Sequence, residues 1–288
     1  MTDAAGPAGE RRTLAALWLL VFAVTSQAMI LAPILPRIAE QLRVPVTRLG
    51  LLVTAYSVAV AAVALVAGPV SDKVGRRRML LVGAAAMTVG LALHAAARGY
   101  PGLLAVRVLT GAGGGVLTGA TAAYVADAFP PERRGRANGW VTSGMAVGQV
   151  VGIPLGTVLA AGWGFRTPFL FFAAAMALAC AMVWRWVPQP EVRREPEPLD
   201  PAAVAARYGA LLRDPRVGVA VAAFGATLLG TTLYTLFLPT WLERARGLTP
   251  REVALLFAAG GVATALAGPA AGRLCDRVGR KRTAVAAT

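Results

Sequence analysis

The sequence predicts an all-α membrane protein with eight apolar helices that cross a bilayer. Of its 288 residues, 57% are hydrophobic and only 15% are charged, whereas soluble domains average about 25% charged residues. The hydrophobic residues gather in runs of about 20, the length that a helix needs to cross a bilayer. Short clusters of Lys and Arg separate these runs, as in the loops of membrane proteins.

Each apolar run is expected to form one helix, because lipid offers the backbone no hydrogen-bond partners. In chain order the runs are Leu14–Leu35, Leu49–Val70, Met79–Ala97, Leu103–Ala126, Trp140–Ala161, Pro168–Val187, Val217–Leu238 and Val253–Ala271. A ninth run starts at Thr283, so we expect the chain to end within a helix of a longer protein.

The first run has a second interpretation. Arg11 and Arg12 followed by an apolar stretch are also typical of a secretory signal peptide, with residues 26–28 as a poor cleavage site. The apolar run continues to Leu35 and reaches spanning length, which favours a membrane helix.

The distribution of basic residues predicts the orientation. A net charge of +15 also suits a nucleic-acid binder, but such proteins gather basic residues on one water-facing surface, so no nucleic-acid partner is expected. One side of the membrane receives most of the Lys and Arg residues, within 11–12, 73–78, 133–136, 185–216 and 273–282. The other side receives Arg37, Arg43, Arg48, Arg98, Arg166, Arg244, Arg246 and Arg251. The richer side is expected to be cytoplasmic, so the N-terminus is predicted to lie in the cytoplasm. The membrane is expected to be a bacterial inner membrane.

The runs divide the chain into four parts. Residues 1–13 form a cytoplasmic tail, 14–187 a six-helix bundle, 188–214 a cytoplasmic linker and 215–288 the start of a second bundle. The linker is rich in proline and charge, which disfavours a helix through its first half. Residues 202–212 are compatible either with a helix on the membrane surface or with a disordered tail of the linker.

A loop pattern occurs twice, at residues 68–78 and 272–282. Both copies read Gly-x-x-x-Asp-basic-Val-Gly-Arg-basic-Arg, and six predicted helices separate them. This spacing indicates a duplicated six-helix unit whose two halves have the same orientation. The loop resembles the signature of the major facilitator superfamily (MFS), which lies between the second and third helices and again between the eighth and ninth.

This resemblance implies an MFS fold of two six-helix bundles, of which the second is incomplete here. It also implies that the Asp and Arg residues of the loop form a conformational gate with an acidic residue at the end of the fourth helix. The gate residues are Gly68, Asp72, Gly75, Arg76, Arg77 and Asp127, and Asp276, Gly279 and Arg280 in the second copy. The alternative is a basic loop that only anchors the topology, which explains Arg77 and Arg78 but not Asp72.

Arg107 lies in the fourth predicted helix, before the glycines 111, 113 and 114, and resembles a second MFS motif with a role in coupling or solute contact. A charged residue within a membrane helix is energetically unfavourable and is expected to face a watery cavity or a partner, although Arg107 could instead extend to the interface.

The resemblance places the transport cavity between the first, fourth and seventh helices. Its candidate residues are Ser26, Gln27, Arg107, Tyr234 and Thr235, with Tyr56 and His94 as secondary candidates. His94 suits either a proton relay or a packed polar side chain.

Glycines recur every four residues in the fifth predicted helix, which lets a neighbouring backbone pack closely. The helix-packing residues are Gly144, Gly148, Gly152, Pro154 and Gly156. The stretch resembles the antiporter signature of MFS drug exporters, but Gln149 replaces its first proline and Pro154 comes later. The position of this proline is closer to that in sugar and metabolite exporters.

Together these features predict a secondary active transporter that exports a small organic solute by alternating access, coupled to protons. No Asp or Glu lies within a complete apolar run, so either the coupling group lies in helices beyond these residues or the carrier is uncoupled. No nucleotide, metal or nucleophile motif is present, so neither a cofactor, a metal site nor an enzyme activity is expected. The partners expected are the lipid bilayer, a small solute and protons, with a monomer as the full-length form.

Two alternatives stay open: a carrier-derived membrane sensor or scaffold, and an inactive fragment. Because the resemblance implies twelve helices, we expect that these 288 residues alone do not transport.

Overall fold

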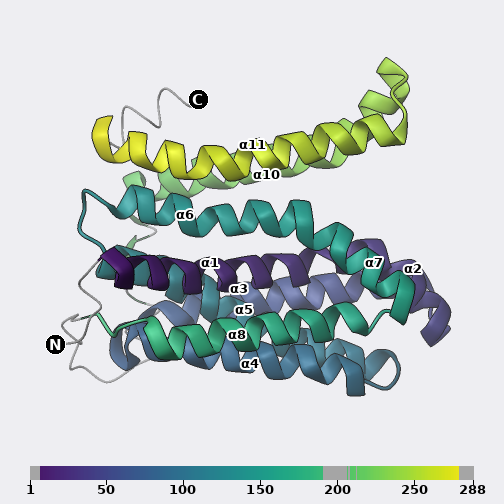
Figure 1. Cartoon of the computed structure of the whole chain (residues 1–288), viewed down its shortest axis with the longest axis horizontal. Helices are drawn as coiled ribbons and strands as arrows, with labels where there is room; N and C mark the ends of the chain where they lie inside the picture. The colour runs from purple at the N-terminus through teal and green to yellow at the C-terminus, as the bar shows by residue number, and fades with distance from the viewer. Residues whose placement is uncertain (1–6, 191–205, 207, 212, 279–288) are drawn as a thin grey trace. The chain divides into compact units, whose positions relative to one another are not determined.

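The computed structural model describes residues 7–190, 206, 208–211 and 213–278, and within these every regular element is a helix (Figure 1). The chain divides into two compact units. The first contains Met1–Glu195 and Gly261–Thr288, and the second contains Pro196–Gly260. The all-α membrane architecture predicted from the apolar runs is therefore confirmed.

The first unit contains the six-helix bundle. Two of its six predicted helices are divided, the first into α1 and α2 and the fifth into α6 and α7. The eight α-helices are α1 (Pro7–Met29), α2 (Leu31–Leu42), α3 (Val46–Val74), α4 (Arg76–Ala96), α5 (Gly99–Ala128), α6 (Arg134–Val147), α7 (Ile153–Trp163) and α8 (Thr167–Trp186). A π-helical turn, Gly148–Gly152, joins α6 to α7. Among the described residues, α1, α3, α4, α5 and α8 are long and apolar enough to cross a membrane. The pair α6 and α7 makes a sixth candidate, bent by 40°.

The seventh and eighth apolar runs also lie in helices, α10 (Pro215–Arg246) and α11 (Pro250–Val278). Asp214 caps α10 by accepting a hydrogen bond from the backbone N–H of Arg216 at 2.8 Å. Gly247, at φ +66°, ends the helix in the left-handed region, which glycine adopts without steric cost. Most of the predicted linker, residues 191–205, lies outside the described residues.

Two of the predicted runs are interrupted rather than continuous. The first run breaks at Ile30, between α1 and α2, because Pro33 cannot donate to the carbonyl of Met29 and its ring clashes there. The fifth run contains the π-helical turn before Pro154, which likewise cannot donate to the carbonyl of Val150. The helices also begin earlier than predicted, α1 at Pro7 and α6 at Arg134.

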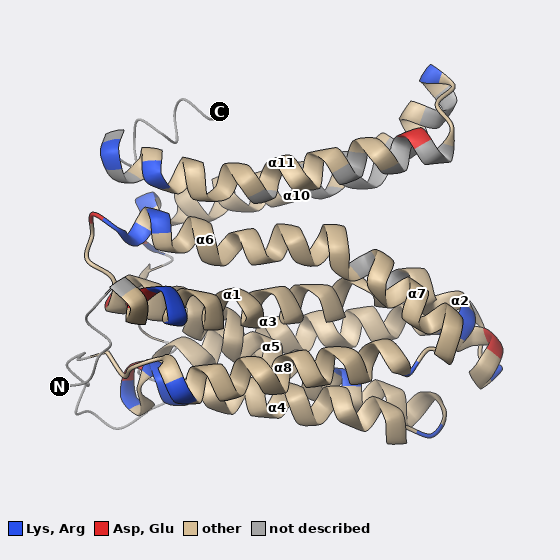
Figure 2. Ribbon diagram, in the orientation of Figure 1, with Lys and Arg blue, Asp and Glu red and all other residues tan. Residues whose placement is uncertain are grey.

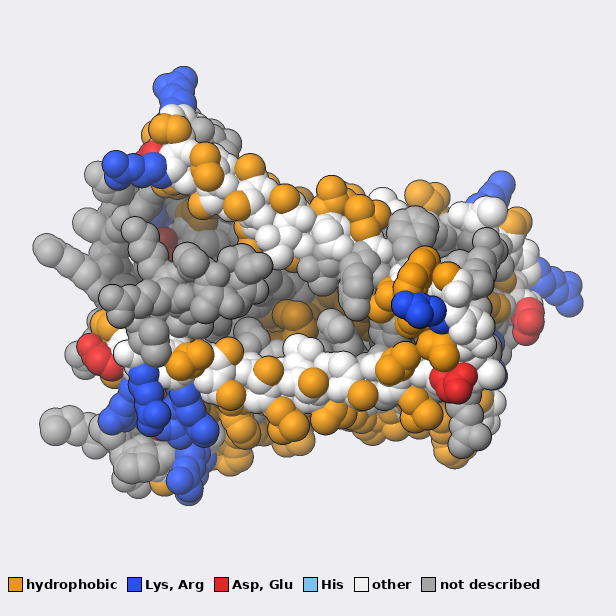
Figure 3. Space-filling view, turned by 90° about the horizontal axis from the view of Figure 1, so that it is seen from above, with side chains coloured by type: hydrophobic (Ala, Val, Ile, Leu, Met, Phe, Trp, Pro, Cys, Tyr) orange, Lys and Arg blue, Asp and Glu red, His pale blue; other side chains and the backbone are white. Residues whose placement is uncertain are grey.

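The bundle core is formed by α3 and α4 against α5, by α4 against α8, and by α1 against α8 and α6. Phe169, Phe172, Leu17, Leu20 and Met87 are among its fully buried side chains. The outward faces carry exposed large hydrophobic side chains, and Figure 3 shows such side chains along the helices. An exposed apolar surface of this extent fits contact with lipid.

Charged residues lie at the ends of the bundle helices (Figure 2). The end where α3 meets α4 and where α6 begins is called the basic end; it carries Arg76, Arg77, Arg78, Arg133, Arg134 and Arg136. The opposite end includes Arg98, before α5, and Arg166, before α8. In the described part of the bundle, the buried side chains are apolar or uncharged and polar, such as Ser26, Gln27 and Thr110, whereas the buried Arg107 is charged.

Candidate functional site

The turn between α3 and α4 places the predicted gate residues together at the basic end. Gly75 stands between the two helices at φ +102°, a conformation that strains any residue with a side chain. Arg76 Nη2 lies 2.5 Å from Asp72 Oδ1 and its Nε lies 2.6 Å from Asp127 Oδ2. One guanidinium therefore links the end of α3, the start of α4 and the end of α5.

Arg77, the next residue, contacts the last turn of α8 and the segment that follows it. Its backbone N–H donates to Gln189 Oε1 at 3.2 Å, and its side chain donates to the backbone carbonyl of Trp184. The hydroxyl of Tyr124 donates to the carbonyl of Pro188 at 3.0 Å. These bonds hold the start of the predicted linker against α4 and α5.

The structure gives less information on the remaining predicted gate residues. Gly68 lies within α3, where an added Cβ would meet nothing within 4 Å. Asp276 lies in α11, but its side chain is outside the described residues, as are Gly279 and Arg280. The structure therefore describes the first copy of the repeated loop and only the helical part of the second.

A second polar cluster lies inside the bundle, between α1, α3 and α5. Arg107 Nη1 donates to Gln27 Oε1 at 3.3 Å, and Gln27 Nε2 donates to the hydroxyl of Tyr56 at 2.9 Å. The guanidinium carbon of Arg107 lies 4.4 Å from the centre of the Tyr56 ring, within the range of a cation–π contact. Three residues far apart in the sequence thus form one buried site.

The charge of Arg107 is only partly compensated. Its side chain is 1% exposed, its Nε has no hydrogen-bond partner, and no carboxylate among the described residues pairs with it. A charge at this depth costs at least about 2.5–3.5 kcal/mol on insertion scales, and a neutral amide and an aromatic ring offset only part of that. Arg107 does not extend to the interface, since it lies buried against α1 and α3.

Other candidates lie outside this cluster. Ser26 is buried and donates to the carbonyl of Gly148 at 3.3 Å, so it joins α1 to the π-helical turn. His94 stacks on Phe169 with ring centres 4.1 Å apart, and its Nδ1 lies 2.9 Å from the carbonyl of Gly90. This is the packed arrangement, although Nε2 is buried without a partner. Tyr234 and Thr235 lie in α10, with side chains outside the described residues.

The predicted glycine face of the fifth run packs on α1. An added Cβ at Gly144 would lie 2.7 Å from the carbonyl oxygen of Trp18, and one at Gly148 would lie 3.1 Å from that of Phe22. Gly152 approaches Ser26 of α1, and Gly156 approaches Ile30, which lies between α1 and α2, with equally little room. Pro154 is exposed, so its side chain takes no part in this contact.

No group of His, Cys, Asp and Glu suited to a metal occurs in the described part of the chain. Both cysteines, Cys180 and Cys275, are free thiols. We call the ion-paired Asp72, Arg76 and Asp127 at the basic end the Arg76 cluster, and Gln27, Tyr56 and Arg107 inside the bundle the Arg107 cluster.

Comparisons with known proteins support one family. The uncharacterized MFS-type transporter YceJ of Bacillus subtilis (strain 168) is 26% identical over 272 residues, which are 93% of this chain and 69% of that protein. Multidrug resistance protein 2 of the same organism is 23% identical over 265 residues, 88% of this chain and 64% of that protein. The chain thus spans roughly two thirds of these relatives' length.

The fold has a counterpart among solved structures. The crystal structure of the human organic anion transporter MFSD10 matches with a TM-score of 0.72 and 20% identity, over 93% of this chain and 73% of that one. The family model described as Major Facilitator Superfamily matches residues 17–288. With eight apolar runs in helices and the loop signature at the α3–α4 turn, the chain belongs to the Major Facilitator Superfamily.

Proposed function

We propose that this protein is part of a secondary active transporter that exports a small organic solute by alternating access, coupled to protons. Family membership supports transport, and a relative named as a multidrug resistance protein supports export. The excess of Arg and Lys at the basic end supports a cytoplasmic location for that end, in a bacterial inner membrane. A monomer is the proposed functional form.

The Arg107 cluster is the proposed contact for the solute or for the coupled proton. The observation that carries this proposal is a fully buried guanidinium whose neighbours, Gln27 and Tyr56, are both uncharged. A charged side chain within the membrane raises the free energy of insertion. Such a residue without a carboxylate partner is therefore a candidate for a functional role. Ser26 of α1, and Tyr234 and Thr235 of α10, are further proposed contacts.

The Arg76 cluster is the proposed gate. Its two carboxylates, Asp72 and Asp127, come from α3 and α5, so a change in the angle of either helix would break one of the two ion pairs. A charged network that two discrete helix arrangements can make or lose is suited to a conformational switch. In the second copy, Asp276, Gly279 and Arg280 are proposed to serve the same purpose.

A flux assay tests the proposed function. The complete product of the gene that encodes this chain is reconstituted in proteoliposomes with an internal pH dye, and sugars, amino acids and organic cations and anions are screened. Proton movement that one solute triggers, and that Arg107→Gln and Asp72→Asn both abolish, is the expected result. Equal flux in both variants and the parent would refute the assigned roles. Solute binding without flux would instead favour a sensor derived from a carrier.

A further inference from the structure

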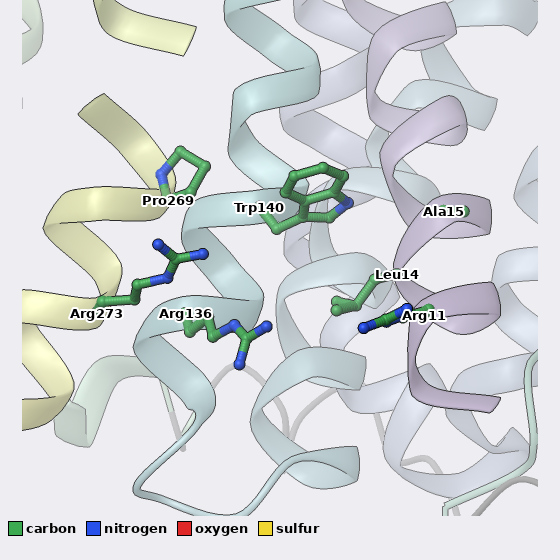
Figure 4. A pocket seen from close by; sticks show the side chains of 7 residues that line it. All are labelled: Arg11, Leu14, Ala15, Arg136, Trp140, Pro269 and Arg273. Carbon is green, nitrogen blue, oxygen red and sulfur yellow. The ribbon is translucent and has the colours of Figure 1, made fainter. Parts of the chain in front are cut away.

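An amphipathic hollow lies at the basic end of the first unit, apart from both polar clusters. It has a volume of about 330 Å³ and is lined by α1, α6 and α11. Figure 4 shows Arg11 approaching from α1, Arg136 and Trp140 from α6, and Pro269 and Arg273 from α11. Leu14 and Ala15 complete an apolar wall, so the hollow combines three cations with a hydrocarbon surface.

A second hollow of about 280 Å³ shares Arg136 and Arg273 with the first. Its other described lining residues are Glu132, Arg133 and Arg277, so the described part of its wall holds four arginines and one carboxylate. Arg133 is also 3.4 Å from Glu10, at the start of α1. Arg136 and Arg273 therefore lie between the two hollows, of which the first has an apolar wall and the second is lined mainly by arginines.

We infer that these two hollows bind an anionic phospholipid, with its phosphodiester on Arg136 and Arg273 and an acyl chain along Leu14 and Trp140. Guanidinium groups recognise phosphate oxygens through charge-assisted, paired hydrogen bonds. Basic pockets between membrane helices bind anionic lipid headgroups, and the negative surface potential of anionic lipids attracts Lys and Arg side chains near the membrane surface.

The shape of the site selects a lipid over a soluble anion. A free phosphate would use the arginines alone and leave the apolar wall of Leu14, Trp140 and Pro269 facing water, which is unfavourable. Trp140, which is 46% exposed in the second turn of α6, is a residue type enriched at the boundary between headgroups and acyl chains. A lipid satisfies both surfaces at once.

Native mass spectrometry of the purified, delipidated chain tests this inference. Phosphatidylglycerol is compared with phosphatidylcholine of identical acyl chains, and inorganic phosphate is added as a competitor. We expect tighter binding of phosphatidylglycerol, weakened by roughly tenfold or more in the double variant Arg11→Gln/Arg273→Gln, because each basic residue near an anionic surface contributes about fivefold.

Matched variants distinguish a specific lipid site from nonspecific electrostatic attraction between the basic end and anionic lipid. Arg12→Gln/Arg78→Gln removes the same charge from exposed residues of α1 and α4 that do not line the hollows, and it is expected to bind normally. Ala15→Trp fills the apolar wall without changing any charge and is expected to weaken binding as the double variant does. Equal losses in both charge pairs, unaffected binding in Ala15→Trp, or displacement by phosphate at the lipid's own concentration would each overturn the inference. Apparent melting temperatures verify that every variant is folded.

Discussion

The Nε of Arg76, at the first position of α4, donates to Asp127 Oδ2 at 2.6 Å, one residue before α5 ends. The same guanidinium lies 2.5 Å from Asp72, so a single side chain bridges two carboxylates from different helices. The Arg76 side chain is only 12% exposed, which limits the screening of these pairs by solvent. The helix ends at the α3–α4 turn are thereby held in one relative arrangement.

We expect Asp127→Asn to lower the free energy of unfolding by about 1 kcal/mol, the upper range for partly exposed ion pairs. Arg76→Gln should cost more, because it removes both ion pairs at once. Apparent melting temperatures in detergent would measure both changes. Glu132→Gln, which removes one charge from an exposed residue at the same end, is the control. A fall as large in Glu132→Gln as in Asp127→Asn would contradict this assignment.

The close approach of α1 and α6 predicts a contrast between two glycines. In Gly144→Ala the new methyl would meet the carbonyl oxygen of Trp18 at 2.7 Å, so the helices must separate, at a cost of about 1–3 kcal/mol. In Gly162→Ala, within α7, the methyl meets nothing within 4 Å, and the higher helix propensity of alanine should stabilise by about 0.5–1 kcal/mol. Thermal unfolding of the two variants should therefore shift in opposite directions; equal shifts would disprove the packing argument.

The start of α11 predicts a local pH dependence. The backbone N–H and the hydroxyl of Thr249 both donate to Glu252 Oε2 at 2.8 Å, and the backbone N–H is the main cause that lowers the pKa of Glu252. Because the pKa is lowered by folding, the cap is fully formed above the pKa of the unfolded chain and is lost as pH falls through the lower folded value. We expect amide exchange at Thr249, corrected for its intrinsic rate, to lose protection over that acidic range.

The variant Glu252→Gln keeps an acceptor oxygen but has no carboxylate to titrate. Its exchange at Thr249 should be independent of pH after the same correction. A pH profile in Glu252→Gln that matches that of the parent protein would show that another group titrates there.

Sequence alone could predict most of the helices but not where they break. Apolar runs of about 20 residues have one physical outcome in lipid, so their helical state follows from length and composition. The interruptions at Ile30 and at Gly148–Gly152 lie just before prolines that were visible in the sequence. Proline kinks and proline breaks have the same sequence pattern, and neighbouring helices decide between them.

For the Arg107 cluster, the sequence predicts candidate residues but not which of them are in contact. The sequence favours Arg107 and Gln27 as site residues, because polar side chains stand out in apolar runs, and it favours Tyr56 less. The structure makes Tyr56 the link between them, with its hydroxyl on Gln27 and its ring beneath Arg107. Which faces of α1, α3 and α5 meet depends on the packing of the whole bundle, and helical periodicity within one helix carries no information about it.

Replacement of Arg107 separates a functional role from a structural one. Arg107→Met removes a buried cation that uncharged partners stabilise only in part, so the relief of its desolvation offsets the lost contacts with Gln27 and Tyr56. We expect an unchanged or higher melting temperature, together with a fall in solute-driven proton flux of at least about tenfold, equivalent to about 1.4 kcal/mol.

Arg107→Lys is the matched variant, since it keeps the charge but loses the planar group that stacks on the Tyr56 ring. If the charge alone matters, flux in Arg107→Lys should recover to near the parent level; if the stacked geometry matters, it should stay low at an unchanged melting temperature. A melting temperature that falls in Arg107→Met by as much as in Gly144→Ala would mean that Arg107 serves mainly to hold α1, α3 and α5 together. In that case its burial would reflect packing, and the contact for the solute would have to be sought on other helices.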